Sequence, residues 1–436
     1  MRSHSLYGLI MIVCGVMLVG CDTTPKGNWY KGNTHTHTLW SDGNDFPDMI
    51  ASWYREADYN FLVLSDHNVL SRGDRWMNHQ HIIRRGGKDA LAKYKQKFGN
   101  EWVQTRGEDK KLEVRLKPLT EVQQKLEVPD QFIMIEGEEI TDRFGVAQIH
   151  TNAANLLEPI PPQRGKGVRE TMRRNLQAVI DQSKKHGKPM IAHLNHPNFH
   201  YSITAEDMAH VLEQTFFEVY NGHTGTGNAG DAIHASTERM WDIANTIRLT
   251  DLNARPMYGI ASDDAHHYHG HSHVSITGRG WVMVRSETLN ADAIITAMQK
   301  GDFYCSTGVE LSTMHYDAKK RKLTVAVKPE PGVRYNIKFI GTLRGTQLNP
   351  QPVKGKNGKP LVDANGRPLR LTQIYSKQVG MTLKEFKGGA GVFHLPPNVL
   401  YVRALITSTK AHPRPSEKGQ VEKAWTQPVG WETIVK

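Results

Sequence analysis

The sequence predicts an α/β protein in which a parallel β/α region, residues 33–306, precedes a smaller all-β, sandwich-like region, residues 307–436. Three observations predict this fold class. Short apolar runs alternate with helical periodicity from residue 33 to about 305, polar clusters stand where those runs stop, and only short strand-like runs follow residue 307. A chain of 436 residues is also too long for one ordinary domain.

Five apolar runs of the first region indicate strands, and they are FLVLSDH, FIMIEGEEI, PMIAHL, FFEVYNG and PMYGIASDDAH. Between the second and the third, residues 169–187 place Met172, Leu176, Val179 and Ile180 on one helical face, and Gly187 is a typical helix stop. In a parallel barrel, groups at the carboxyl ends of the strands collect at one mouth. The polar clusters are therefore expected to share a site.

Residues 69–130 interrupt this alternation with a segment rich in lysine and arginine. A connection of that length is usually functional or has structure of its own, so it predicts either a cap over the barrel mouth or a solvated helical insertion. After residue 307, the runs KLTVAVKP, RYNIKFIG and VLYVRALITS are separated by Gly, Pro and Asn. This pattern is typical of a small β-sandwich.

The first twenty residues predict a secretory signal, because one arginine precedes an apolar run that is too short to remain in a bilayer. The residues LVGC at 18–21 resemble the lipobox of bacterial lipoproteins, which implies cleavage before Cys21 and lipidation of its sulfur. The expected location is the cell envelope, anchored by lipid and facing the periplasm, with residues 21–32 as a linker. An ordinary cleaved signal is the alternative, and Asp22 does not decide between inner and outer membrane.

Cysteine usage excludes a disulfide framework. Cys14 leaves with the signal and Cys21 would carry lipid, so Cys305 remains alone. The formal net charge is +11, and it becomes +10 once the signal with its single Arg2 is removed. Such a charge predicts either an affinity for anions or simply a solvated basic surface.

The stretch NTHTHTLWSDG at residues 33–43 suggests a metal site. Residues i and i+2 of a strand face the same side, so His35 and His37 can present both imidazoles to one ion. An isolated pair of this kind is also common among surface and core histidines. Further candidates stand at other strand ends, and they are Asp42, Asp66, His67, Glu136, Glu138, Glu139, His150, His193, His196, Asp263, Asp264 and His266.

Five ordered motifs in residues 30–305 resemble the PHP family, named for its polymerase-associated and histidinol-phosphatase members. The motifs are HTHTLWSDG, SDHN, GEEIT with IHTNAANL, IAHLNHPN and SDDAH. The resemblance implies a distorted (β/α)7 barrel and a metal-dependent phosphoesterase. Exported members of the family that carry a small C-terminal domain are the most similar in organisation.

The resemblance also implies a set of metal ligands: His35, His37, Asp42, His67, Glu139, His150, His193, Asp264 and His266. His35 and His37 would bind one ion, and Asp42 and His67 a neighbouring one. The G-x-E spacing selects Glu139 as the bridging carboxylate over Glu136 and Glu138. Glu139 and Asp264 are the expected catalytic residues, and Asp263 is the alternative to Asp264.

This ligand set suits two or three divalent ions, Zn²⁺, Mn²⁺ or Fe²⁺, and the ligand types do not choose among them. Paired ions can activate water for attack on a phosphoryl group, which agrees with the lack of a nucleophile motif such as G-x-S-x-G. Further side chains are expected to contact substrate: His196, Asn221, His223 and His269. The run HHYHGHSH around His269 has a second interpretation, an exposed loop that binds stray metal.

The expected activity is hydrolysis of a phosphomonoester or phosphodiester, with a phosphorylated small molecule or a nucleotide as substrate and the membrane as a partner through the lipid anchor. Two alternatives belong to other classes. An amidohydrolase also opens with HxH on a barrel strand, but its carboxylated lysine has no clear candidate here. A non-catalytic metal-binding or adhesion module on a PHP scaffold would be expected to lose ligands.

Overall fold

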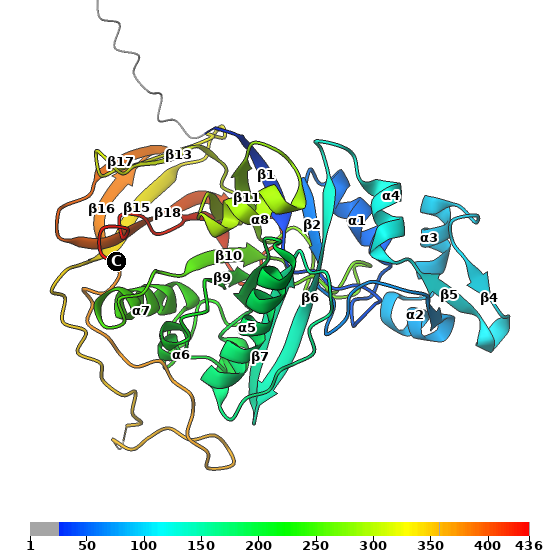
Figure 1. The fold of residues 1–436 in the computed structure, drawn as a ribbon, viewed down its shortest axis with the longest axis horizontal. Helices are drawn as coiled ribbons and strands as arrows, with labels where there is room; N and C mark the ends of the chain where they lie inside the picture. Colours follow the sequence, from blue (N-terminus) through cyan, green and yellow to red (C-terminus); the bar gives the residue numbers. More distant parts are fainter. Residues whose placement is uncertain (1–25, 357, 436) are drawn as a thin grey trace, which may run out of the picture.

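The computed structural model describes residues 26–356 and 358–435. The predicted α/β class is confirmed: one large mixed sheet runs through the molecule, with helices packed on the half that contains the first region (Figure 1). The predicted signal, residues 1–20, and Cys21 lie outside the described residues. No described helix combines the length and the apolarity that crossing a bilayer requires.

Nine strands of the large sheet come from the first region. They are β1 (Asn28–Asn33), β2 (Phe61–Leu64), β6 (Ile133–Phe144), β7 (Ala147–Ala154), β8 (Ile191–Leu194), β9 (Phe216–Asn221), β10 (Tyr258–Ser262), β11 (Trp281–Ser286) and β12 (Phe303–Ser306). The five predicted strands correspond to β2, β6, β8, β9 and β10. The expected linker, residues 21–32, differs from the structure because its last residues belong to β1, which pairs with β11.

The strand pairing is mixed rather than uniformly parallel. β1, β2 and β6 are parallel neighbours, and so are β8, β9 and β10. Between these two groups lies β7, which is antiparallel to both β6 and β8, and the hairpin β6–β7 turns at Gly145 with a φ of +59°. The hairpin arises because β6 continues for five residues beyond Glu139 before its chain reverses.

The strand pairing does not form the closed barrel that the sequence predicted. Each strand has two hydrogen-bonding edges, and those of β1 are occupied by β2 and β11. β10 therefore meets this part of the chain only beyond the end of β1, at a single parallel bridge between Thr36 and Ala265. Within the described residues the sheet has two edges, β10 and β16.

Helices cover the first region, and they are α1 (Pro47–Glu56), α5 (Val168–His186), α6 (Ala205–His210), α7 (Thr237–Thr250) and α8 (Ala291–Gln299). A short 3₁₀ turn, η2 (Phe199–Tyr201), follows β8. The predicted helix is α5: its Met172, Leu176 and Val179 are buried, and Gly187 ends it in the left-handed conformation. Met172 and Leu176 join Ile149 and Ile191 of the sheet in the main core.

The insertion at 69–130 has structure of its own and projects on the side away from the C-terminal strands (Figure 1). It contains β3 (Arg75–Asn78), α2 (His79–Gly86), α3 (Ala90–Phe98), β4 (Thr105–Arg106), the turn η1 (Asp109–Lys111), β5 (Glu113–Leu116) and α4 (Leu119–Leu126). Its small core includes Leu39, Trp40 and Phe46 from the loop after His37. Trp40 Nε1 donates to the Lys117 carbonyl at 3.1 Å, so the insertion packs directly on that loop.

The described residues after 306 form strands and loops in two facing layers. The strands are β13 (Leu311–Asp317), β14 (Lys322–Val327), β15 (Tyr335–Leu343), β16 (Met381–Lys387), β17 (Ala390–His394), β18 (Val399–Ala411) and β19 (Val421–Thr426). One layer is the sheet β13-β14-β17, and both layers contribute to a core that includes Val325, Ile337 and Phe393. The other layer continues the large sheet, because β19 pairs with β12. No break in hydrogen bonding separates the two regions at residue 306.

Candidate metal centre

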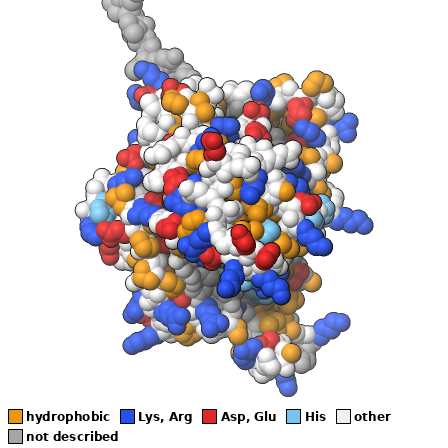
Figure 2. Space-filling model, turned by 90° about the vertical axis from the view of Figure 1, so that its right-hand side faces the viewer, with side chains coloured by type: hydrophobic (Ala, Val, Ile, Leu, Met, Phe, Trp, Pro, Cys, Tyr) orange, Lys and Arg blue, Asp and Glu red, His pale blue; other side chains and the backbone are white. Residues whose placement is uncertain are grey.

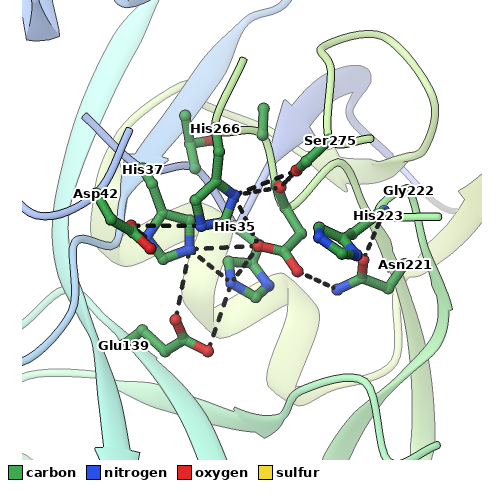
Figure 3. Close-up of polar contacts among 12 residues, drawn as sticks. His35, His37, Asp42, Glu139, Asn221, Gly222, His223, His266 and Ser275 are labelled. Atoms are coloured by element: carbon green, nitrogen blue, oxygen red, sulfur yellow. Dashed lines mark hydrogen bonds and ion pairs between the residues drawn. The ribbon is translucent and has the colours of Figure 1, made fainter. Parts of the chain in front are cut away.

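The polar candidates converge where strands of the first region end (Figure 3). His35 and His37 follow β1, His67 follows β2, and Asp264 and His266 follow β10. Glu139 lies within β6 and forms a backbone β-bridge with His67, while His150 lies on the paired strand β7, opposite Thr141. The carboxyl ends of parallel strands meet at one edge, so these distant segments supply one cluster.

The innermost group consists of His35, His37, Asp264 and Glu139. The two Nε2 atoms lie 3.1 Å apart, and each is 3.2–3.3 Å from Asp264 Oδ1. Glu139 Oε1 is 3.6 Å from His35 Nε2, and Oε2 is 3.4 Å from His37 Nε2. Four ligand atoms of a tetrahedral site with bonds of about 2.0–2.1 Å are about 3.3–3.4 Å apart. The two Nε2 atoms and Asp264 Oδ1 therefore have the spacing of three ligand atoms of one divalent cation, and Glu139 approaches the same two imidazoles.

Glu139 also belongs to a second group, with His150 and His196. Its Oε1 lies 3.0 Å from His150 Nδ1 and 3.6 Å from His196 Nε2. Nε2 of His150 is buried and has no hydrogen-bond partner in the part of the chain that the structure describes. His196 further meets His35 and Asp264 in another group. A carboxylate shared in this way can hold two neighbouring cations.

The outer group contains Asp42, His67 and His266 beside His37. Oxygens of Asp42 lie 3.4 Å from His67 Nε2 and 3.3 Å from His266 Nε2. The Asp42 side chain is 51% exposed and that of His67 26%, whereas His35 and His37 are fully buried. The centre is therefore closed on the side of His35 and open to solvent beside Asp42.

The charges within the centre call for cations. Burial alone would raise the pKa of Glu139, but His67, His150 and His35 hold that pKa well below its usual range. The pKa of Asp264 is likewise held well below its usual range, against burial, by His35, His37 and His266. Burial and the neighbouring His266 and His67 lower the pKa of His37 to about 3, so its ring is neutral. Ionised carboxylates and a neutral imidazole are the forms that bind metal.

Glu218 is a residue of the centre that no sequence motif singles out. It lies in β9, fully buried, and its Oε1 is 2.7 Å from His35 Nδ1. The backbone NH of His196 and the Asn221 amide donate to Oε2 at 2.8 and 2.7 Å. A carboxylate behind a ligating histidine fixes the ring's orientation and tautomer. The sequence signal that could have identified Glu218 was an acidic residue inside the mainly apolar run FFEVYN.

The structure differs from the sequence expectation at His193 and His196. His193 belongs to none of the four candidate groups, although its buried ring lies 6.3 Å from that of His35. His196, expected to contact substrate, belongs to two of them. The reason is the backbone: His196 has a φ of +23°, which turns its ring back towards Glu139. Strand alternation cannot anticipate such a turn.

The sequence left open which acidic residue of each motif faces the histidines, and the structure distinguishes these residues by their hydrogen-bond partners. The carboxylate of Asp263 accepts the backbone NH groups of Gly278, Arg279 and Gly280 and the Tyr54 hydroxyl, whereas Asp264 faces His35 and His37. Glu136 pairs with Arg72, and Glu138 accepts the NH of Ile160. Asp264 and Glu139 are therefore the acidic residues of these two sets that face the imidazoles.

The three remaining substrate candidates occupy different places. The fully buried Asn221 donates to Asp264 Oδ2 at 3.1 Å and so orients that carboxylate. His223 is half-buried, with its ring 6.3 Å from that of His266, beside the centre (Figure 3). His269 Nε2 donates to the Asn44 carbonyl at 3.0 Å, and its ring lies outside the four groups. Only His223 is thus available beside the opening.

Phe199 lies over the rings of the centre. Its ring centroid is 5.0 Å from that of His196 and 6.2 Å from that of His223. The neighbouring His200 and Tyr201 both have positive φ, and Tyr201 stacks on His234 with centroids 3.4 Å apart. Such strained backbone persists where its surroundings hold it. The loop therefore presents a fixed aromatic surface at the mouth.

Comparisons with known proteins found seven similar chains among solved structures, and two of them are as follows. One is a two-domain protein from Bacteroides vulgatus that contains a predicted PHP-like metal-dependent phosphoesterase; it is 12% identical, with 93% of this chain and 97% of that chain covered and a TM-score of 0.37. The other is a proposed metal-dependent phosphoesterase from Bifidobacterium adolescentis, also 12% identical, with 58% and 94% covered and a TM-score of 0.29.

No family model and no curated protein matches the chain. Because both TM-scores are low, the functional conclusion rests on the residues of the metal centre and not on these two structures.

Glu218→Gln tests the geometry behind His35. The substitution keeps the size of the side chain but removes the charge that holds the imidazole, so the metal affinity should fall about 10- to 100-fold. Titration of metal-free protein with Zn²⁺ in the presence of a competing chelator measures the change. Glu136→Gln is the matched control, because Glu136 pairs with Arg72 away from the centre and its loss should leave affinity unchanged. Equal affinities in wild type and Glu218→Gln would contradict this role.

Proposed function

We propose that the chain is a metal-dependent phosphoesterase that hydrolyses a phosphomonoester or phosphodiester. The observation that carries this proposal is the position of Glu139, a buried carboxylate shared by two groups of imidazoles. The sequence resemblance to the PHP family supports the same reaction class. The excess of positive charge, +11 over the whole sequence, agrees with an anionic substrate. Lys and Arg side chains, with Asp and Glu side chains among them, are spread over the face that carries α2 and α3 (Figure 2).

Two or three divalent ions, Zn²⁺, Mn²⁺ or Fe²⁺, would be held by this centre. The residues proposed to hold them are His35, His37, Asp42, His67, Glu139, His150, His196, Asp264 and His266, with His196 in place of His193. When bound, such ions stabilise negative charge on phosphoryl oxygens and lower the pKa of water. The unequal exposure of Asp42 and His35 supports an approach of the substrate from the Asp42 side.

The chain's own residues orient and enclose this centre. Glu218 holds His35 through Nδ1, and Asn221 holds Asp264. Nδ1 of His223 accepts the backbone NH of Gly225 at 3.0 Å, so the neutral ring carries its hydrogen on Nε2. Burial lowers the pKa of His223, which favours that neutral form. We assign to His223 the donation of a hydrogen bond to an oxygen of the substrate.

An amidohydrolase mechanism is the second candidate by sequence, but its usual bridging group is a carboxylated lysine. Here the shared position between the groups is held by the carboxylate of Glu139. A non-catalytic binding module would retain metal without turnover. Assays with p-nitrophenyl phosphate and its bis ester in added Mn²⁺ or Zn²⁺ distinguish the two functions, because a phosphoesterase hydrolyses such esters and a non-catalytic binding module does not.

Glu139→Gln tests the proposed chemistry. Removing the shared charge should lower turnover at saturating metal by at least about 100-fold, which corresponds to about 2.7 kcal/mol of transition-state stabilisation. Glu136→Gln should have little effect, because that carboxylate pairs with Arg72. Comparable losses in both variants would refute the assignment of the bridging role to Glu139, and full activity in Glu139→Gln would remove it from the reaction.

We also propose that the protein is an exported bacterial lipoprotein, anchored in the cell envelope through Cys21. This proposal rests on the sequence LVGC and the apolar run before it. Cys21→Ala removes the sulfur to which lipid would be attached, so the protein should leave the membrane fraction or remain unprocessed. Fractionation by centrifugation with immunoblotting measures this, and an unchanged, processed membrane-bound protein would count against the anchor.

A further inference from the structure

A cavity of about 660 Å³ lies outside the metal centre. Its walls are α1, the end of α3, the loop 267–279 after His266, and residues 413–415 of the C-terminal region. None of its lining residues belongs to the four candidate metal groups. The volume is within the range of about 300–1,000 Å³ that is usual for small-molecule sites. The cavity is therefore large enough to enclose a ligand of its own.

One wall of the cavity is aromatic and apolar. Trp53 and Tyr268 line it, together with Met49, Ile50 and Ile276. Trp53 is half-buried, and its ring packs edge-on against that of Tyr54 at 5.1 Å. Tyr268 is held by its hydroxyl, which donates towards the carbonyls of His37 and Ala265 at 2.7 Å. Fixed rings of this kind bind flat apolar groups at little entropic cost.

The cavity also contains a cation without a matching carboxylate. Lys97 pairs with Glu56 at 2.8 Å, and the carboxylate of Asp45 lies 3.5 Å from His269 Nε2. Arg414 has no ion pair with any described residue. Its guanidinium lies 5.3 Å from the Trp53 ring centroid, and Nη1 donates to the carbonyl and hydroxyl oxygens of Thr277 at 3.1 Å. The remaining guanidinium donors of Arg414 have no hydrogen-bond acceptor within the described residues.

We propose that this cavity binds a small organic anion with a flat apolar body. The anionic group, a carboxylate, sulfonate or phosphate, pairs with Arg414, and the flat body lies against Trp53 and Tyr268. A planar guanidinium that lies over an indole is suited to such a ligand, because it can form paired hydrogen bonds to the anion while its cation–π contact holds it in place. This site is separate from the reaction centre and does not rest on the proposed function.

The position of Arg414 is also fixed by the backbone around it. Its NH donates to His412 Nδ1 at 3.0 Å, and its carbonyl accepts from Arg279 Nε at 3.0 Å. Arg279 is buried and donates further to the carbonyls of Gly222 and Val274. The backbone that carries Arg414 is therefore already held by hydrogen bonds, so the entropic cost of ordering it when a ligand binds is small.

The test uses 1-naphthalenesulfonate as the probe and the metal-loaded protein, with binding measured by calorimetry. The expected dissociation constant is on the order of 0.1 mM, given the size of the probe. Arg414→Gln and Trp53→Leu should each raise it at least tenfold. Arg143→Gln, on the exposed tip of the β6–β7 hairpin, should leave it unchanged, and so should the metal-centre variant Glu139→Gln. Thermal unfolding shows which variants are folded.

A second comparison needs no variant. The uncharged 1-naphthalenemethanol should bind wild-type protein at least tenfold more weakly than the sulfonate, because it cannot pair with Arg414. The proposal is overturned if wild type does not bind the sulfonate up to about 5 mM, which is about 50 times the expected constant. It is also overturned if the alcohol binds equally well, if folded Arg414→Gln and Trp53→Leu both bind the sulfonate as wild type does, or if Glu139→Gln abolishes binding.

Discussion

The buried carboxylate of Glu139 is the constraint on which the rest of the centre depends. It is 1% exposed and is approached by His35, His37, His67, His150 and His196. An ionised group that far from water is tolerated only when positive charge faces it. The imidazoles supply only part of that charge: neighbouring carboxylates raise the pKa of His35 and His67 despite burial, whereas burial and the neighbouring His266 and His67 keep His37 neutral. The divalent cations that we propose between these rings would satisfy the carboxylate and the imidazoles together.

The remainder of the chain braces the segments that carry these side chains. The insertion packs its small core on the loop that bears Asp42, and Arg75 donates to the Trp40 carbonyl in that loop at 2.6 Å. On the other side, Arg279 joins the loop after His266 to residues 414 and 415. The C-terminal region therefore supports the centre as well as continuing the sheet. A ligand in the cavity beside Arg414 would rest on the same braced loop.

The sequence predicted those features of the structure that depend on neighbouring residues in the chain. The G-x-E spacing that the PHP resemblance implies favoured Glu139, and strand alternation explains why Glu136 and Glu138 face away from it. Helix α5 was predicted with its buried face and its stop at Gly187. Other features depend on distant partners. The left-handed turn at His196, the role of Glu218 behind His35, and the pairing of β19 with β12 each join segments far apart in sequence.

Metal content tests the central claim most directly. Full-length protein purified without a tag, loaded with Mn²⁺ or Zn²⁺ and freed of excess ion, should contain two or three ions per chain by elemental analysis. Occupancy should fall as the pH drops below about 6, because imidazoles must be neutral to bind. One ion or fewer per chain at neutral pH would contradict a centre in which Glu139 is shared between neighbouring cations.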